Sequence, residues 1–204
     1  MPLYRRSHTK AEGSVFMKQR MLNALEENPI IAAAKDDESL QQAIASSCRV
    51  IFILYGNLMT VSGLVNQIQA AGKLAFVHMD LIEGLSSKEI AVDSLKAIAG
   101  PDGIISTRAT QIRRARHLDM LTVQRFFVID SMSIRGLQSQ LKIGKPDMVE
   151  VLPGLMPRVI TDVIQITEAP LIASGLIQYK EEVVAALRAG AAAISTTAPA
   201  VWEL

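Results

Sequence analysis

The sequence predicts an α/β fold: a (β/α)8, TIM-like barrel with a reduced or missing eighth helix and an additional N-terminal helix. Short apolar runs alternate with polar segments of helical period along the chain after Pro29. Most of these runs are continuously apolar, as expected of parallel strands that are covered on both faces. Eight such runs favour a closed barrel over an open doubly wound sheet, which is the alternative. The runs are residues 29–34, 49–56, 73–80, 102–108, 121–130, 147–154, 170–177 and 191–198.

The segments between these runs carry helix start and stop signals. Ser86 precedes Glu89 by three residues, which is a capping-box pattern, and Gly100 ends the same segment. Residues 179–190 place acids in the first turn and Arg188 in the last, which complements the helix dipole. Helices of this kind between parallel strands are the crossovers that a barrel requires.

The two ends of the chain depart from a regular barrel. We expect a helix over residues 15–28, before the first strand, and residues 1–16 as a flexible tail. Only residues 199–204 follow the last strand, so Trp202 is predicted to cover the flank that a full eighth helix would cover. No break in composition divides the rest of the chain, and residues 17–204 are therefore predicted to form one barrel domain.

The composition excludes several classes of protein. The net charge of +1 gives no overall field for nucleic acid or membranes, so an RNA site would be a local patch. The single cysteine, Cys48, excludes an intramolecular disulfide framework and fits a reducing compartment. No apolar run approaches the ~20 residues of a membrane span, and the basic start lacks the apolar region of a secretory signal. We expect a cytoplasmic protein with no membrane partner; the sequence leaves a homo-oligomer open.

Polar residues collect where the predicted strands end. In "HMDLIEG", His78 and Asp80 share one face of an extended chain, and Glu83 follows in the loop. In barrels of this kind the functional site forms at the carboxyl ends of the strands. Because such residues recur at strand after strand, we expect them to converge on one site. The other polar residues at strand ends are Tyr55, Ser106, Thr107, Arg108, Gln124, Arg125, Asp130, Glu150, Ser174, Ser195, Thr196 and Thr197.

The last two strands predict a phosphate site. "IASGLI" and "ISTTA" place Gly175 and the hydroxyl residues Ser195 and Thr196 just before loops. Barrels often bind phosphate in these loops, where main-chain N–H groups converge and glycine permits close approach. Tight packing of strand against helix, which also needs small residues, is the alternative explanation.

The charged residues on the opposite rim allow more than one interpretation. His78, Asp80 and Glu150 could hold a divalent metal or act as acid and base. They could instead hydrogen-bond the hydroxyl groups of a small polyol, while Arg108 and Arg125 pair with carboxylates or a phosphate. A ring of salt bridges without a ligand is the third interpretation. The spacing alone does not choose among them.

The segment "ATQIRRARHLD" is strongly basic. At helical spacing Arg113, Arg116 and His117 share the face opposite an apolar stripe, and Arg114 lies at its side. A solvated helix face explains this pattern, and so does contact with the phosphate backbone of RNA.

Five stretches together resemble one known family: "HMDLIEGLSSKEIAVD", "PDGIISTR", "LTVQRFFVIDS", "PDMVEVLPGLMP" and "IASGLIQYKEEVVAALRAGAAAISTT". They are similar in order and spacing to the glycerol-3-phosphate-responsive antiterminator proteins of bacteria. The resemblance implies a TIM barrel that senses glycerol-3-phosphate in the cytoplasm. It implies action on the leader of glycerol-operon messenger RNA, so that transcription passes a terminator. Glycerol-3-phosphate is then an effector, with no catalytic residue, cofactor or metal.

The resemblance also implies which residues bind the ligand. It assigns the phosphate to Gly175, Leu176, Ser195 and Thr196. It assigns the glycerol hydroxyls to His78, Asp80 and Glu150, with Arg108 or Arg125 reaching either end. Candidate RNA contacts are Arg113, Arg114 and Arg116. Two positions depart from the usual pattern: Ser174 stands where a glycine is usual, and "STTAP" lacks an expected asparagine. A TIM-barrel enzyme acting on a small phosphorylated polyol is the alternative, and signalling to a protein partner is a third.

Overall fold

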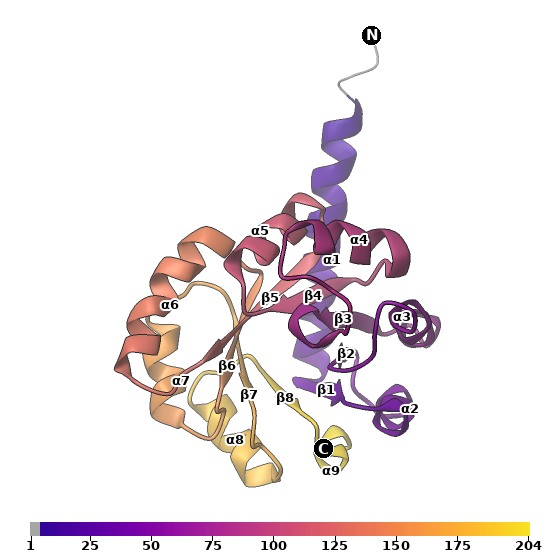
Figure 1. Ribbon diagram of the computed structural model, residues 1–204. Helices are drawn as coiled ribbons and strands as arrows, with labels where there is room; N and C mark the ends of the chain where they lie inside the picture. Colours follow the sequence, from indigo (N-terminus) through magenta and orange to yellow (C-terminus); the bar gives the residue numbers. More distant parts are fainter. Residues whose placement is uncertain (1–4) are drawn as a thin grey trace.

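The structure, a computed structural model, describes residues 5–204, with side chains from residue 15 onward. Its eight strands are parallel and close into a barrel in chain order, with β8 pairing back to β1. Figure 1 shows the helices arranged around the outside of this barrel. The (β/α)8 barrel predicted from the sequence is therefore confirmed. The strands are β1 (Ile30–Ala34), β2 (Val50–Ile53), β3 (Leu74–His78), β4 (Gly103–Ser106), β5 (Leu121–Phe127), β6 (Met148–Leu152), β7 (Leu171–Ser174) and β8 (Ala193–Thr196).

A helix precedes the first strand, and every strand is followed by one. The helices are α1 (Arg5–Glu27), α2 (Asp37–Ala45), α3 (Val61–Ala70), α4 (Ile90–Ala99), α5 (Ala109–His117), α6 (Ser131–Gly144), α7 (Pro157–Ile164), α8 (Lys180–Arg188) and α9 (Pro199–Trp202), with a short 3-10 helix at Met79–Leu81. None of the helices in the described part of the chain is long and apolar enough to cross a membrane.

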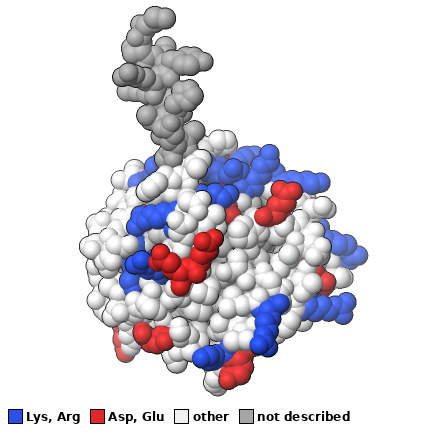
Figure 2. Space-filling model, turned by 180° about the vertical axis from the view of Figure 1, so that it is seen from behind, with Lys and Arg blue, Asp and Glu red and all other residues white. Residues whose placement is uncertain are grey.

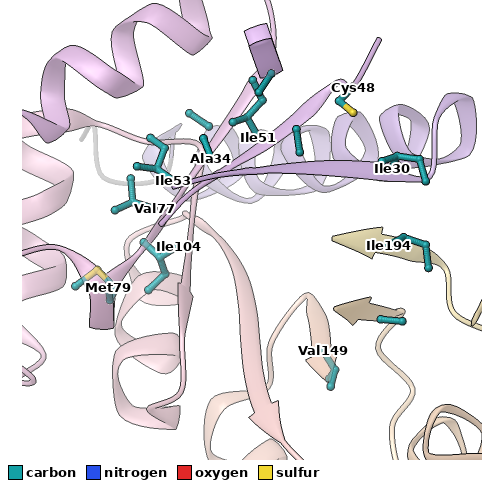
Figure 3. Packing of buried hydrophobic residues seen from close by; sticks show 14 of the residues in the cluster. Ile30, Ala34, Cys48, Ile51, Ile53, Val77, Met79, Ile104, Val149 and Ile194 are labelled. Carbon is teal, nitrogen blue, oxygen red and sulfur yellow. The ribbon is translucent and has the colours of Figure 1, made fainter. Parts of the chain in front are cut away.

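Two apolar clusters account for the continuously apolar strands. Val50 and Phe52 of β2 belong to the cluster that fills the barrel, where the rings of Phe52 and Phe76 lie 5.5 Å apart. Ile51 and Ile53 point the other way and belong to the cluster between the strands and the helices (Figure 3). Successive side chains of a strand alternate between its faces, so each strand is apolar throughout because both of its faces are buried.

Helix α1 closes the end of the barrel at which the strands begin. Its residues Met21 and Leu25 join the inner cluster together with Leu74 and Leu121, the first residues of β3 and β5. The N-terminal helix predicted from the sequence is therefore confirmed. It begins earlier than expected, at Arg5, within the segment for which the sequence predicted a tail. Residues 5–16 of this segment contain no proline, the residue that would most strongly interrupt a helix.

The reduced eighth helix is also confirmed, since α9 has only four residues. Trp202 is 1% exposed and belongs to the outer cluster, as does Cys48. The indole N–H of Trp202 donates to the Thr196 carbonyl at 2.9 Å, and the Ser47 hydroxyl donates to the Trp202 carbonyl at 3.0 Å. One large side chain thus closes the flank between α2 and β8 that a full helix would otherwise cover.

One predicted helix start is wrong. The pattern of Ser86 and Glu89 predicted a capping box, but α4 begins at Ile90 and has no side-chain cap. The amide nitrogen of Gln111, on α5, instead donates to the main-chain carbonyls of Ser86 at 3.2 Å and Lys88 at 3.5 Å. A tertiary contact therefore holds these residues outside the helix.

Replacing Trp202 tests whether this side chain supports the barrel. We expect Trp202→Ala to lower the free energy of unfolding by about 3–5 kcal/mol, because it leaves a cavity and removes a buried hydrogen bond. Urea unfolding followed by circular dichroism measures the change. Trp202→Phe, which keeps most of the volume, should lose clearly less. Equal stability of Trp202→Ala and the unaltered protein would show that α9 is not needed to close the barrel.

Candidate functional site

A cavity of about 230 Å³ lies at the carboxyl ends of the last strands. Its lining brings together the four residues predicted for the phosphate, Gly175, Leu176, Ser195 and Thr196, and also Arg125 from β5. Ser174 and Thr197, which the sequence placed at strand ends without a role in binding, line it as well. Gln178 also lines it, and no signal in the sequence indicated this residue.

The loop after β7 has an unusual backbone. Gly175 has a φ of 78°, and Leu176, which is not a glycine, has a φ of 64°. The left-handed region is costly for a residue with a β-carbon, and such backbone is concentrated at binding sites. The Leu176 side chain is exposed and has no polar atom, so only the main chain of this residue can offer a hydrogen bond. Neither N–H group is hydrogen-bonded to another described residue, which leaves two donors for a ligand.

Thr196 holds the two loops together. Its hydroxyl donates to the Ile177 carbonyl at 2.6 Å and accepts from the Ala198 N–H at 3.1 Å. This hydroxyl therefore already has partners on both sides of the cavity. Ser195 differs: its buried hydroxyl oxygen has no hydrogen-bond partner among the described residues. Because a buried polar group without a partner is costly, Ser195 is the hydroxyl that a ligand would satisfy.

A buried ion pair crosses from β5 to β6 inside the barrel. Nε of Arg125 donates to Oε2 of Glu150 at 2.6 Å, and a terminal nitrogen of Arg125 donates to Oε1 at 3.1 Å. Arg125 is 7% exposed and Glu150 is fully buried. The two residues are direct neighbours in the strand register. Glu150 therefore orients a guanidinium group that also lines the cavity and brings a fixed positive charge to it.

His78 lies deep in the barrel and is neutral. It is 3% exposed, and burial together with the nearby charge of Arg125 lowers its pKa from 6.5 to about 3. Its Nδ1 has no hydrogen-bond partner among the described residues and lies 3.9 Å from Oδ2 of Asp80, which is too far for a hydrogen bond. Because the imidazole is uncharged at neutral pH, this approach is not an ion pair. A neutral imidazole can still accept or donate a hydrogen bond.

Asp80 is already occupied by its neighbours at the end of β4. Its Oδ1 pairs with Arg108, and its Oδ2 accepts from the Thr107 N–H at 2.8 Å and the Ser106 hydroxyl at 3.3 Å. The predicted rim residues therefore form two groups. His78, Arg125 and Glu150 lie inside the barrel, whereas Asp80 and Arg108 join β3 to β4 at its edge. Of these five described residues, Arg125 alone lines the cavity, and His78, Glu150, Asp80 and Arg108 do not.

Two further points from the sequence concern the position of Glu83 beside the predicted site and the interpretation of the rim as a metal site. Glu83 lies in the loop after β3, and its main chain bridges to Asn57 without reaching the cavity. Within residues 15–204, whose side chains the structure describes, no three His, Cys, Asp or Glu side chains gather in a way that could hold a metal ion.

The basic residues predicted to share one face of α5 have different surroundings in the structure. Arg113 pairs with Glu89 at 2.8 Å, and Arg114 pairs with Asp93 of α4. Hydrogen bonding by Arg114 lowers the pKa of Asp93. Arg116 points instead toward a hollow between α5 and α6, which Arg113 also lines.

Comparison with known proteins identifies the family. A family model described as glycerol-3-phosphate responsive antiterminator matches residues 30–202. The chain is 45% identical over 184 residues to the uncharacterized protein YgcP of Escherichia coli K12, covering 90% of this chain and 96% of that one. It is 33% identical to the glycerol uptake operon antiterminator regulatory protein of Listeria monocytogenes, with a TM-score of 0.83 over 86% of this chain and 95% of that one.

A second crystal structure, of a glycerol uptake operon antiterminator-related protein from Thermotoga maritima, is 32% identical with a TM-score of 0.76, and covers 86% of this chain and 98% of that one. The N-acetylmannosamine-6-phosphate 2-epimerase of Clostridium perfringens, at 17% identity and a TM-score of 0.64, shares the fold alone. The fold and the site thus define the class of the protein, which is a TIM-like barrel with a polar cavity at the carboxyl ends of its strands. Within that class, the chain belongs to the glycerol-3-phosphate responsive antiterminator family, which is a family of regulators.

The buried neutral His78 predicts how stability depends on pH. Below about pH 6.5 the unfolded chain binds a proton that the folded protein does not bind until about pH 3. The free energy of unfolding should therefore fall as the pH drops from 6.5 to 5, by up to about 1.4 kcal/mol per pH unit.

Urea unfolding at intervals between pH 5 and 7.5 measures this dependence. His78→Asn should flatten it, while His117→Asn, at an exposed position, should leave it unchanged. The same slope in His78→Asn as in the unaltered protein would show that another group causes the pH dependence.

Proposed function

We propose that this protein senses glycerol-3-phosphate in the cytoplasm. With the ligand bound, it binds the leader of glycerol-operon messenger RNA and allows transcription to pass a terminator. It acts as a regulator and not as an enzyme. Membership of the family supports this proposal, and so does the cavity at the strand ends.

The observation that carries the ligand proposal is the composition of the cavity. It combines the guanidinium of Arg125 with a buried hydroxyl that has no partner, that of Ser195, and with two unpaired N–H groups at Gly175 and Leu176. Positive charge and convergent donors are what a phosphate needs. The volume of about 230 Å³ lies below the roughly 300–1,000 Å³ of sites for drug-sized ligands, so it suits a small phosphorylated polyol.

In this proposal the phosphate lies at Gly175, Leu176 and Ser195, with Thr196 holding its two loops in place. The glycerol end points into the barrel, where His78 Nδ1 has no partner. Glu150 then contributes mainly through Arg125, and Asp80 and Arg108 contribute by fixing the edge of the barrel. This assignment changes the roles expected for Glu150 and Asp80 from direct contacts to supporting ones.

The coupling to RNA requires that glycerol-3-phosphate bind two states of the protein with different affinities. The loop after β7 is suited to move, because its strained Leu176 backbone gains partners only when a ligand fills the cavity. The strands beneath it form the rigid scaffold.

Thermal melts with a panel of small molecules test the ligand. At about 100 times its dissociation constant, glycerol-3-phosphate should stabilise the protein by roughly 2.7 kcal/mol, or roughly 5–10 °C. Glycerol should have no effect, and inorganic phosphate a smaller one. Ser195→Ala should reduce the shift for glycerol-3-phosphate, while Ser94→Ala, on the exposed face of α4, should retain it. A flat response to the whole panel would contradict the proposed ligand.

Filter binding tests the RNA partner. We expect the glycerol-operon leader to bind more tightly in the presence of glycerol-3-phosphate than in its absence, and a scrambled RNA of equal length to bind weakly with no response to the ligand. No difference between the leader and the scrambled RNA at any ligand concentration would contradict action on messenger RNA.

A further inference from the structure

A basic groove lies between the carboxyl-terminal ends of α5 and α6. Its volume is about 570 Å³. A second hollow of about 420 Å³ shares three residues with it, Arg116, Lys142 and Lys145, and extends toward the loop before β7. The two hollows therefore adjoin at these three cations, and we call them together the α5–α6 groove. Its other basic residues are Arg113 and His117.

The three shared cations are free to bind an external anion. Arg116, Lys142 and Lys145 form no ion pair with another described residue, whereas Arg113 and Arg114 are engaged by Glu89 and Asp93. Figure 2, which views the molecule from behind, shows Lys and Arg side chains gathered at the upper right, the side on which α5 and α6 lie.

Two carboxylates, those of Asp147 and Glu168, line the groove, and neither forms an ion pair with the three cations. Asp147 accepts from the Thr122 N–H and hydroxyl at 3.0 and 2.8 Å and lies 3.6 Å from Lys18. Glu168 lines only the second hollow. The groove therefore keeps an excess of positive charge, although the whole chain has a net charge of only +1.

The helix dipole explains only part of this arrangement. Cations near the carboxyl end of a helix are favourable, and Lys142 lies in the last turn of α6. Lys145 lies beyond that turn, in a left-handed cap with a φ of 47°. Arg116 reaches the same groove from a different helix. Three cations, from α5, from α6 and from the cap of α6, border two adjoining hollows, which matches a ligand with several phosphates better than a single ion.

The lining also indicates how such a ligand would be recognised. No Phe, Tyr or Trp lines either hollow, so the groove has no platform on which unpaired bases could stack. Contact with the phosphate backbone requires only the cations, and base-paired RNA is recognised mainly through its shape and backbone.

We propose that the α5–α6 groove binds the phosphodiester backbone of a base-paired stem in the leader RNA, through Arg116, Lys142 and Lys145. This inference rests on the proposed function and specifies its RNA surface. The groove also lies away from the ligand cavity, because Met120 and Asp147, which line it, precede β5 and β6, whereas the cavity lies where strands end. RNA and glycerol-3-phosphate therefore bind without competing for one surface.

Strand β5 connects the two sites. Arg125 lines the cavity, and the preceding residue, Gln124, is buried and packs against Gly144 of α6, which Ile112 of α5 also approaches. Both polar atoms of the Gln124 amide lack a hydrogen-bond partner among the described residues. A shift of β5 on ligand binding would thus act directly on the two helices that form the groove.

A double charge reversal tests the groove. Fluorescence anisotropy would measure affinity for a leader stem-loop at several salt concentrations, with glycerol-3-phosphate present. We expect Lys142→Glu with Lys145→Glu to weaken binding at least tenfold and to lower the salt-dependence slope by about 2, one for each lost phosphate contact. The charge-matched control, Lys88→Glu with Arg158→Glu, alters exposed residues away from the groove and should retain affinity and slope. A normal thermal shift with glycerol-3-phosphate shows that each variant is folded.

The outcomes separate the groove from the proposed function. If the unaltered protein binds the stem-loop and the groove variant binds as tightly as the control, the groove is not the RNA surface, and the function stands. If the unaltered protein binds no leader RNA, the proposed function fails and the groove proposal fails with it. If single-stranded poly(U) competes as well as an unlabelled stem-loop, a base-paired partner is excluded.

Discussion

The buried pair of Arg125 and Glu150 is the interaction on which the candidate site depends. Removing two charges from water is costly, and the cost is recovered only when the pair is closely matched, as the two parallel hydrogen bonds here are. Loss of either partner would leave an unpaired charge inside the barrel, at about 3–5 kcal/mol. Burial is the main cause of the lowered pKa of His78, and the nearby charge of Arg125 adds to it. The ion pair thus fixes a guanidinium group at the cavity and helps to keep a histidine inside the barrel neutral.

The remaining features of the cavity are consistent with a site completed by a ligand. Most polar groups at the strand ends are satisfied within the protein, as Asp80 and Thr196 show. Among the described residues, the Ser195 hydroxyl and the N–H groups of Gly175 and Leu176 lack partners at the cavity, and His78 Nδ1 lacks one inside the barrel. The Gln124 amide, on the outer face of β5, is a further case away from the cavity. Buried polar groups without partners are rare in stable proteins, and those beside a cavity and a fixed charge are candidates for ligand contact.

Much of the fold could be predicted from the sequence, because parallel strands that are buried on both faces are continuously apolar. The eight strands, the N-terminal helix and the short last helix followed from that pattern. Residues 175, 176, 195 and 196, which the sequence places at strand ends, lie around one cavity together with Arg125. That they bind a phosphate stays a prediction. What required the structure was the partner of each side chain. The sequence shows neither that Arg108 engages Asp80 nor that Arg114 engages Asp93, since these pairs join different elements. Likewise, the sequence does not show that Gln111 hydrogen-bonds to the main chain of Ser86, where a capping box had been predicted.

A crystal structure of the complex with glycerol-3-phosphate would test the central claim most directly. The account predicts phosphate oxygens within about 3 Å of the Gly175 and Leu176 nitrogens and the Ser195 hydroxyl, with Arg125 still paired to Glu150 and the glycerol end toward His78. Binding of the phosphate elsewhere, for example at Arg108 on the edge of the barrel, would contradict it. So would a cavity that stays empty at saturating ligand.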